Sequence, residues 1–306
     1  MKTIYTLLFM FLILSSGYAK KIQLTLKLEQ GKEYRQVSDS KVNVNQEING
    51  QKMNIVIQVK ASMTYLVKAV NDHDYDLEVK YDSLSMIMQL PQATMMFSSE
   101  KNNEQDMVSQ ILGALKNQPF GLKLSDTGKV MEVTNIESLF ESIFSKFPQT
   151  ADSQVTPMKD QIKSLYGEDS FKGNIQMVTA IFPEGPVAIG DTWTVDTKVE
   201  SGMSANVSTT YTLKDSQKDY VLIDGDSKFE SANKDAYSET NGMPIRYDLA
   251  GTIKSGLKID SRTGWIIEAK LNQDIQGNTY IKESDQMPNG MKIPMTMNSE
   301  TVVTNQ

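Results

Sequence analysis

Residues 53–69 read MNIVIQVKASMTYLVKA, with an apolar side chain at every odd-numbered position from Met53 to Ala69. Polar side chains occupy most of the even-numbered positions. Period-two alternation is typical of a β-strand with one covered face. A strand of this length would extend for about 55 Å, whereas most strands have about 3–10 residues. We therefore expect this strand to twist strongly or to be broken by a bulge.

The same alternation recurs later in the chain, around Ile245–Ile259, Trp265–Leu271 and Met291–Val303. Between the alternating segments, Asn-Gly pairs supply the positive-φ positions of tight hairpin turns. These pairs are Asn49-Gly50, Asn241-Gly242 and Asn289-Gly290. The pattern predicts antiparallel strands joined by hairpins.

Helical periodicity is confined to the middle of the chain, where apolar side chains recur from Met107 to Leu115 and from Ile136 to Phe147. Thr156-Pro157 is expected to open a third helix that Gly167 closes, and a fourth short helix is expected to carry Phe171 and Ile175. A weak repeat relates the two flanking parts, since Gly121-Leu122-Lys123-Leu124 resembles Gly256-Leu257-Lys258-Ile259. We predict an α+β fold that is mostly antiparallel β, with two related curved sheets or half-barrels and a central helical segment. The expected divisions are a signal peptide (1–19), a first β-rich half with one inserted helix (20–134), a helical connector (135–180) and a second β-rich half (181–306). The alternative is that the repeat is a coincidence among short strand patterns.

The N-terminus has the three parts of a signal peptide. Lys2 is followed by the apolar run Ile4–Leu14 and by small residues that end at Ala19. We expect cleavage after Ala19 and a periplasmic or secreted protein with no membrane span. The alternative is a retained anchor, but the apolar run is shorter than the ~20 residues that a span requires.

Composition excludes several classes of partner and chemistry. The chain contains no cysteine, so we expect no disulfide, thiol catalysis or lipid anchor on cysteine. After removal of residues 1–19, 30 basic and 38 acidic residues remain, giving a net charge of −8. That balance argues against nucleic acid as a partner.

No catalytic motif withstands inspection. Asp126-Thr127-Gly128 matches the aspartic-protease signature, but such enzymes require two carboxylates. The repeat-equivalent position is Arg262, so we interpret both segments as turns. His73 is the only histidine, and we interpret it as a solvated loop residue. We therefore expect no enzyme activity, no cofactor and no metal site.

Methionine is abundant, with 18 in the chain. Flexible thioether side chains suit surfaces that adapt to varied apolar ligands. We predict an apolar-ligand site lined by the methionines of two strand faces and by a helical stripe, namely Met86, Met88, Met291, Met295, Met297, Phe140 and Phe144. The alternative is that these side chains fill an ordinary core.

Residues 182–193 read FPEGPVAIGDTW. This segment resembles a family of exported bacterial proteins of unknown function that share a Pro-x-x-Pro-Val-x-x-Gly-Asp-x-Trp motif. The resemblance implies an exported β-rich protein and brings no established activity. The expected architecture is also similar to lipoprotein-carrier half-barrels. Two functions stay open: a non-catalytic protein that binds an apolar or lipid-like ligand, or a structural or interaction module that packs against another envelope protein.

Overall fold

The computed structural model describes residues 20–101, 106–146, 159, 162–163, 166–200, 203–240, 243–283 and 288–305. The predicted signal peptide (1–19), the predicted helix start at Thr156-Pro157 and the predicted turn at Asn241-Gly242 lie outside these residues. Among the described residues, no helix is both long enough and apolar enough to cross a membrane.

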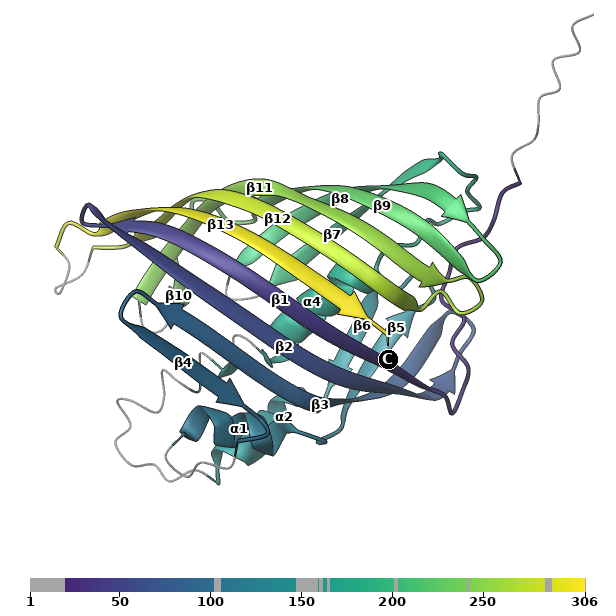
Figure 1. Ribbon diagram of the computed structural model, residues 1–306, viewed down its shortest axis with the longest axis horizontal. Coiled ribbons are helices and arrows are strands. Elements are labelled where there is room, and N and C mark those ends of the chain that lie inside the picture. Colours follow the sequence, from purple (N-terminus) through teal and green to yellow (C-terminus); the bar gives the residue numbers. More distant parts are fainter. Residues whose placement is uncertain are drawn as a thin grey trace, which may run out of the picture.

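Antiparallel strands dominate the fold (Figure 1). The strands before the central helices are β1 (Glu33–Ile48), β2 (Gln51–Val70), β3 (Asp74–Leu90), β4 (Ala93–Ser98), β5 (Phe120–Ser125) and β6 (Val130–Thr134). The helices are α1 (Met107–Leu115), between β4 and β5, then α2 (Ile136–Phe144) and α4 (Glu168–Thr179). The later strands are β7 (Thr192–Glu200), β8 (Ser204–Ser216), β9 (Tyr220–Ser231), β10 (Ser238–Thr240), β11 (Met243–Asp260), β12 (Ile266–Ile281) and β13 (Met291–Thr304).

All these strands belong to one sheet, whereas the sequence suggested two. Its order is β6-β5-β3-β2-β1-β13-β12-β11-β9-β8-β7, with β4 paired to β3 and β10 paired to β11. The two parts of the chain join where β1 pairs with β13, from Val37 opposite Thr304 to Gln46 opposite Met295. Thus the first and last strands pair at the centre of an open sheet, and α2 and α4 lie in the chain between the edge strands β6 and β7.

The alternating run at 53–69 forms most of β2, as predicted. The pairing of β2 with β3 shifts register between Ser62 and Met63 and again between Val67 and Ala69. These irregularities interrupt the long strand, as its length led us to expect. The hairpin before β2 turns at Asn49 and Gly50, whose φ angles are 51° and 78°. Both are positive, as a type I′ turn requires.

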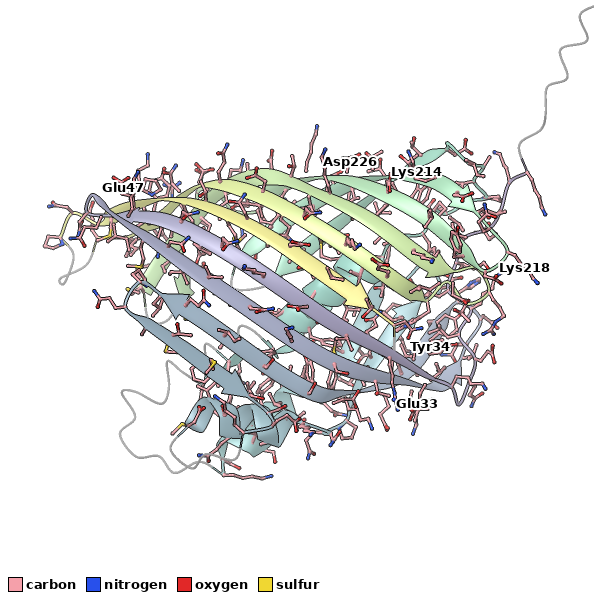
Figure 2. The ribbon with its side chains drawn as sticks, viewed as in Figure 1. Glu33, Tyr34, Glu47, Lys214, Lys218 and Asp226 are labelled. Atoms are coloured by element: carbon pink, nitrogen blue, oxygen red, sulfur yellow. The ribbon has the colours of Figure 1, made fainter. Side chains whose placement is uncertain are left out.

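The sheet has an apolar face and a polar face. We define the inner face as the one that carries Met63, Tyr65 and the residues paired with them across the strands. The outer face carries charged side chains, such as Lys60 and Asp39, which form a 2.7 Å ion pair across β2 and β1. Figure 2 shows Glu47 and many other charged side chains at the surface of the sheet. Because one face is polar, the core lies on the inner face.

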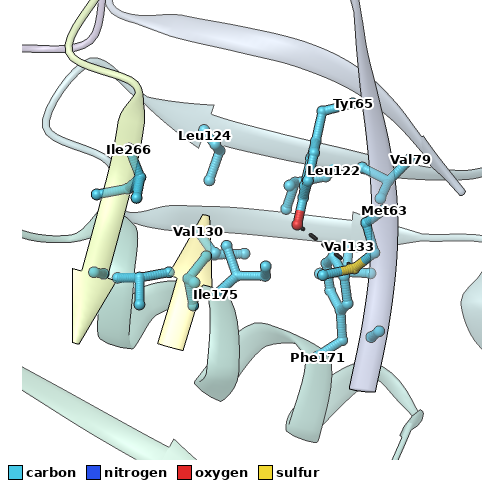
Figure 3. Close-up of a cluster of buried hydrophobic side chains, with 14 of the residues drawn as sticks. Met63, Tyr65, Val79, Leu122, Leu124, Val130, Val133, Phe171, Ile175 and Ile266 are labelled. Carbon is cyan, nitrogen blue, oxygen red and sulfur yellow. Dashed lines mark hydrogen bonds between the residues drawn. The ribbon is translucent and has the colours of Figure 1, made fainter. Parts of the chain in front are cut away.

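Helix α4 covers part of the inner face and contacts both edge strands. Phe171 of α4 stacks edge-on against Phe120 of β5 at 4.8 Å between ring centroids. Figure 3 shows Phe171 and Ile175 of α4 among buried side chains of the sheet. At the end of the helix, the Thr179 hydroxyl donates to the carbonyl of Gly128 at 2.7 Å, beside the start of β6. On the other side, Gly173 packs against Val199 of β7.

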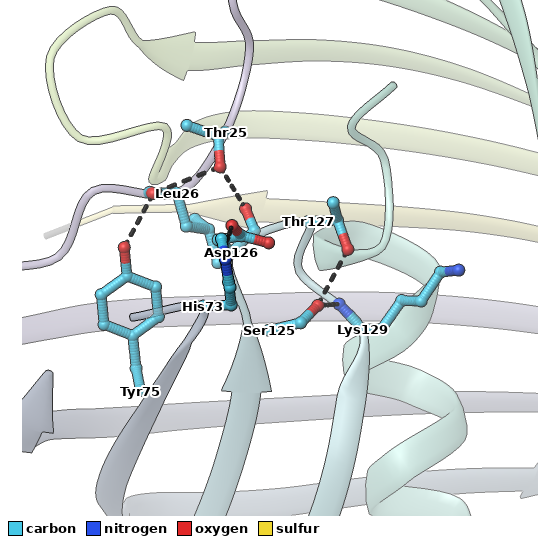
Figure 4. Close-up of polar contacts among 8 residues, drawn as sticks. All are labelled: Thr25, Leu26, His73, Tyr75, Ser125, Asp126, Thr127 and Lys129. Atoms are coloured by element: carbon cyan, nitrogen blue, oxygen red, sulfur yellow. Dashed lines mark hydrogen bonds and ion pairs between the residues drawn. The ribbon is translucent and has the colours of Figure 1, made fainter. Parts of the chain in front are cut away.

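The segment before β1 crosses one end of the sheet. Ile22 pairs with Val187 in an antiparallel bridge, and Leu24, Leu26 and Leu28 are buried. The Tyr75 hydroxyl donates to the carbonyl oxygen of Leu26 at 2.8 Å (Figure 4). The segment therefore closes the core at this end.

Candidate functional site

A cavity of about 260 Å³ lies between α4 and the inner face near the centre of the sheet. Neighbouring strands β1, β2, β12 and β13 form its floor, and α4 forms its roof. The lining includes apolar side chains, among them Val59, Met63, Ile175 and Leu271. The cavity exists where the helix and the sheet separate, because small side chains such as Ser38 occupy the floor.

Polar side chains form a row along the floor of the cavity. Gln36, Ser38 and Ser40 follow one another on the inner face of β1, with Thr301 beside them on β13. The hydroxyls of Ser40 and Thr301 lie 2.8 Å apart and bond to each other. Among the described residues, those that line the cavity include no Asp, Glu, Lys, Arg or His. The site is thus polar but uncharged.

Two buried polar atoms in the lining have no hydrogen-bond partner within the described part of the chain. They are Nε2 of Gln36 and the hydroxyl of Tyr166. Gln36 is 2% exposed and Tyr166 is 7% exposed. Burial raises the pKa of Tyr166 to about 12, so its hydroxyl keeps its proton at neutral pH. Leaving such a donor unpaired costs about 1–3 kcal/mol, so an acceptor that reached either atom would relieve that cost.

The inner face continues beyond the cavity as an apolar strip. We define this apolar strip as Val42 and Val44 of β1, Ile55 and Ile57 of β2, Met88 of β3 and Met297 of β13. Cross-strand pairing places Ile57 next to both Val42 and Met88, and Val44 next to both Ile55 and Met297. All six side chains are half-buried. The strip therefore leaves apolar surface partly open along the same strands that floor the cavity.

The predicted methionines lie together on one face, although the sequence suggested two. Met86 and Met88 share the inner face with Met291, Met295 and Met297, because β1 joins the two groups of strands. Met86 is buried opposite Val59, at the side of the cavity, and the other four are half-buried.

The predicted aromatic residues lie elsewhere. Phe140 and Phe144 are buried in the hydrophobic core, with their ring centroids 5.7 Å apart, on helix α2. Helix α2 packs against α1 and β5. Neither ring belongs to the lining of the cavity, so the site proposed below does not include them.

Gln36 and Tyr166 were not among the site residues predicted from the sequence. The sequence does contain a pattern that points to Gln36. On β1, Val42 and Val44 are apolar and face inward, whereas the preceding inward positions are polar. These polar residues are Gln36, Ser38 and Ser40. Polar side chains at inward positions of a strand indicate a polar pocket or a buried hydrogen-bond network. Tyr166 gives no comparable signal, because a single tyrosine before a helix is common in ordinary cores.

The segments that resembled catalytic motifs are turns. Gly128 and Gly264 both have positive φ angles, 80° and 70°. Nδ1 of His73 lies 3.1 Å from Oδ2 of Asp126 at the surface (Figure 4), and the His73 side chain is 86% exposed. Arg262 forms an ion pair with Glu29. In the described part of the chain, no group of three or more His, Asp or Glu residues is placed to hold a metal ion.

A wider depression of about 1080 Å³ lies elsewhere, at the ends of β1, β2, β11, β12 and β13. Most of its lining residues belong to the outer face, including Asn45, Asn54, Gln276 and Thr296. None of its lining residues carries a buried unpaired polar atom among those described. The cavity beneath α4 is therefore the stronger candidate for a binding site.

These features define a mostly antiparallel β protein with an uncharged internal cavity. The chain belongs to a family described as "Family of unknown function (DUF6263)", which matches residues 72–266. The match includes the FPEGPVAIGDTW segment. No curated protein matches the chain.

Three solved structures share limited similarity with the chain. A structure of lipid–protein interactions in lipovitellin has a TM-score of 0.49 and 11% identity over 92% of this chain and 25% of that chain. An outer membrane channel from Pseudomonas putida F1 has a TM-score of 0.24 and 8% identity, covering 92% of this chain and 97% of that chain. An outer membrane lipoprotein-sorting protein domain from Vibrio parahaemolyticus has a TM-score of 0.15 and 7% identity, covering 88% and 85%. At these values, the similarities assign neither activity nor ligand to this chain.

Proposed function

We propose that this chain is an exported, non-catalytic protein that binds an apolar or lipid-like ligand against the inner face of its sheet. The observation that carries the proposal is the uncharged cavity beneath α4, which continues into the half-buried apolar strip. An ordinary core would bury these strip residues fully, as the same face does at Tyr65 and Val67. The signal-peptide pattern of residues 1–19 supports export.

The size of the cavity supports a ligand that extends onto the strip. Pockets that enclose drug-sized ligands measure about 300–1,000 Å³, and the cavity has about 260 Å³. It therefore holds only part of such a molecule. Covering the strip would add apolar contact at about 25 cal/mol per Å² of surface removed from water. The methionines of the inner face can adapt to different chains, because their side chains are unbranched and flexible.

Paired substitutions on β13 test this proposal. Met297 points to the inner face, and its neighbour Asn298 points to the outer face and is exposed. We expect the neutral apolar dye N-phenyl-1-naphthylamine to bind saturably to the mature protein. Met297→Asp should weaken binding at least tenfold, because it places a carboxylate in the apolar strip. Asn298→Asp adds the same charge on the opposite face and should leave the dye affinity unchanged.

Two results would contradict ligand binding. One is wild-type protein that binds no dye, and the other is an equal loss in both variants at matched thermal stability. Mass spectrometry of protein purified from its own host supplies an independent check, since a bound amphiphile should co-purify with it.

A second candidate function is an interaction module of the cell envelope. It is favoured by β4, a six-residue strand that pairs only with β3 among the described strands. Its Met96 side chain is 55% exposed. A free strand edge with apolar side chains accepts a strand from a partner. In that case, Met96→Lys should abolish a complex with the partner and leave dye binding unchanged.

A further inference from the structure

We infer that the cavity beneath α4 receives the uncharged polar end of an acyl ligand, an ester or amide carbonyl, whose chain follows the apolar strip. This inference rests on the proposed function, because it names the ligand class for the same site. It is carried by the identity of the polar groups in the cavity, by the lack of charge around them and by the direction in which the cavity continues.

The unpaired groups in the cavity are hydrogen-bond donors. They are the amide nitrogen of Gln36, a residue of β1, and the hydroxyl of Tyr166, which precedes α4; both residues line the cavity. The hydroxyls of Ser40 and Thr301 bond to each other, which leaves the proton of one hydroxyl as a further donor. A carbonyl oxygen has two lone pairs and can accept from two donors. An acceptor without acidic or basic character therefore fits these two groups.

The described lining carries no charge that could balance a charged ligand. No Asp, Glu, Lys, Arg or His of the described part of the chain lines the cavity, and Tyr166 keeps its proton because burial raises its pKa to about 12. A fatty-acid carboxylate or a phosphate buried here would lose its hydration without gaining a cation. The site therefore favours esters and amides over free acids and phospholipid headgroups.

The cavity adjoins the apolar strip, along which an acyl chain can continue. Its volume of about 260 Å³ corresponds to about nine water molecules at roughly 30 Å³ each. That space holds a carbonyl group and a short piece of chain. The lining includes Ser40 and Val59, which are paired across β1 and β2. The next inner positions on these strands are Val42 and Ile57, where the apolar strip begins.

Three ligands with the same chain length test which polar end the site prefers: one ends in an ester, one ends in a carboxylate and one has no polar end. We would measure how methyl palmitate, palmitate and hexadecane displace N-phenyl-1-naphthylamine at pH 7.5. We expect methyl palmitate to bind at least tenfold more tightly than either of the others. Tyr166→Phe should weaken methyl palmitate five- to twentyfold and leave hexadecane unchanged, because it removes one donor and keeps the ring. Gln36→Leu should also weaken the binding of methyl palmitate and leave that of hexadecane unchanged, because it removes the other donor.

Tyr75→Phe is the matched control. The Tyr75 hydroxyl is also buried, but it donates to the carbonyl of Leu26 at 2.8 Å, and Tyr75 does not line the cavity. Its loss should leave the preference for the ester unchanged. Tyr166→Phe differs from wild type by one oxygen atom, so it decides the test if Gln36→Leu does not fold.

The outcomes distinguish this inference from the proposed function. If the dye and hexadecane bind but the ester has no advantage, or if Tyr166→Phe does not reduce that advantage, the inference is wrong. The two donors are then paired with ordered water, and the proposed function stands. Preference for palmitate would also overturn the inference. If neither the dye nor any of the three probes binds, the proposed function itself fails.

Discussion

The backbone amide of Leu26 donates a 2.8 Å hydrogen bond to the carbonyl oxygen of Asp126. The next amide, that of Lys27, donates a bond of equal length to Thr263. Asp126 lies in the turn between β5 and β6, and Thr263 lies in the turn between β11 and β12. These turns belong to opposite parts of the sheet, so one short segment ties the two parts together. The two turns are also the repeat-equivalent segments of the sequence.

The close approach of this segment to the second turn predicts a large effect of Gly264→Ala. Gly264 has a φ of +70°, and a Cβ there would lie 2.4 Å from the carbonyl oxygen of Thr25. The substitution adds left-handed strain and forces backbone atoms apart. We expect the free energy of unfolding to fall by about 2–4 kcal/mol, measured by urea denaturation.

Gly31→Ala separates strain from steric conflict. Gly31 has a similar φ of +78°, but a Cβ there would meet no heavy atom within 4 Å. Gly31→Ala should therefore lower the free energy of unfolding by only about 1–2 kcal/mol, which is the effect of the left-handed backbone alone. Equal losses in the two variants would show that the N-terminal segment does not press against the turn.

Asp260 predicts a pH-dependent contribution to stability. Its Oδ1 accepts hydrogen bonds from the amide of Thr263 at 2.7 Å, from the Thr263 hydroxyl at 2.9 Å and from the amide of Arg262 at 3.0 Å. Burial is the largest single influence and would raise the pKa, but these hydrogen bonds and the charge of Arg262 together lower it. A lowered pKa in the folded state stabilises the protein above the unfolded pKa of about 3.9. That stability is lost as the pH falls through the folded value.

We therefore expect Asp260→Ala to lower the free energy of unfolding by about 1–2 kcal/mol at pH 7. The difference from wild type should shrink as the pH is lowered below about 3.9. Urea denaturation at a series of pH values measures the loss of stability at pH 7 and its decrease at low pH. Asp226→Ala, an exposed position on the outer face of β9 (Figure 2), should change stability by less than about 0.5 kcal/mol throughout. A cost for Asp260→Ala that stays constant down to pH 2 would contradict the role of its carboxylate.

Local features of the fold could be predicted from the sequence. Alternation from Met53 to Ala69 predicted β2, because inward and outward side chains repeat every two residues whatever the strand pairs with. The Asn49-Gly50 pair predicted a tight turn, because positive φ angles are a property of the residues themselves. The same reasoning identified Gly128 and Gly264 as turn glycines rather than parts of a catalytic motif.

Pairing between distant strands could not be predicted in this way. Alternation shows which side chains of β13 face inward, but many partner strands would satisfy that pattern. The prediction of two sheets was wrong for that reason, since it gave each part of the chain its own sheet. The cavity was missed because it depends on how α4 crosses the strands, and only that packing brings Tyr166 near Gln36. The sequence predicted that the methionines lie on two separate strand faces, whereas their common face follows from the β1–β13 pairing.

The burial of Phe140 predicts a structural role for this ring rather than the ligand contact expected from sequence. Phe140 is fully buried and packs with Phe144 on α2, outside the lining of the cavity. Phe140→Ala should lower the free energy of unfolding by about 3–5 kcal/mol. The exposed neighbour Glu141 provides the control, and Glu141→Ala should have little effect.

Binding is best measured on Phe140→Leu, which keeps most of the apolar volume and so preserves the fold. Its affinity for N-phenyl-1-naphthylamine should equal that of wild type, because no atom of Phe140 lines the cavity or the apolar strip. A folded Phe140→Leu variant that binds the dye tenfold more weakly would place this ring at the ligand after all. The site would then extend from the cavity beneath α4 to helix α2, and an acyl chain would follow a path other than the apolar strip.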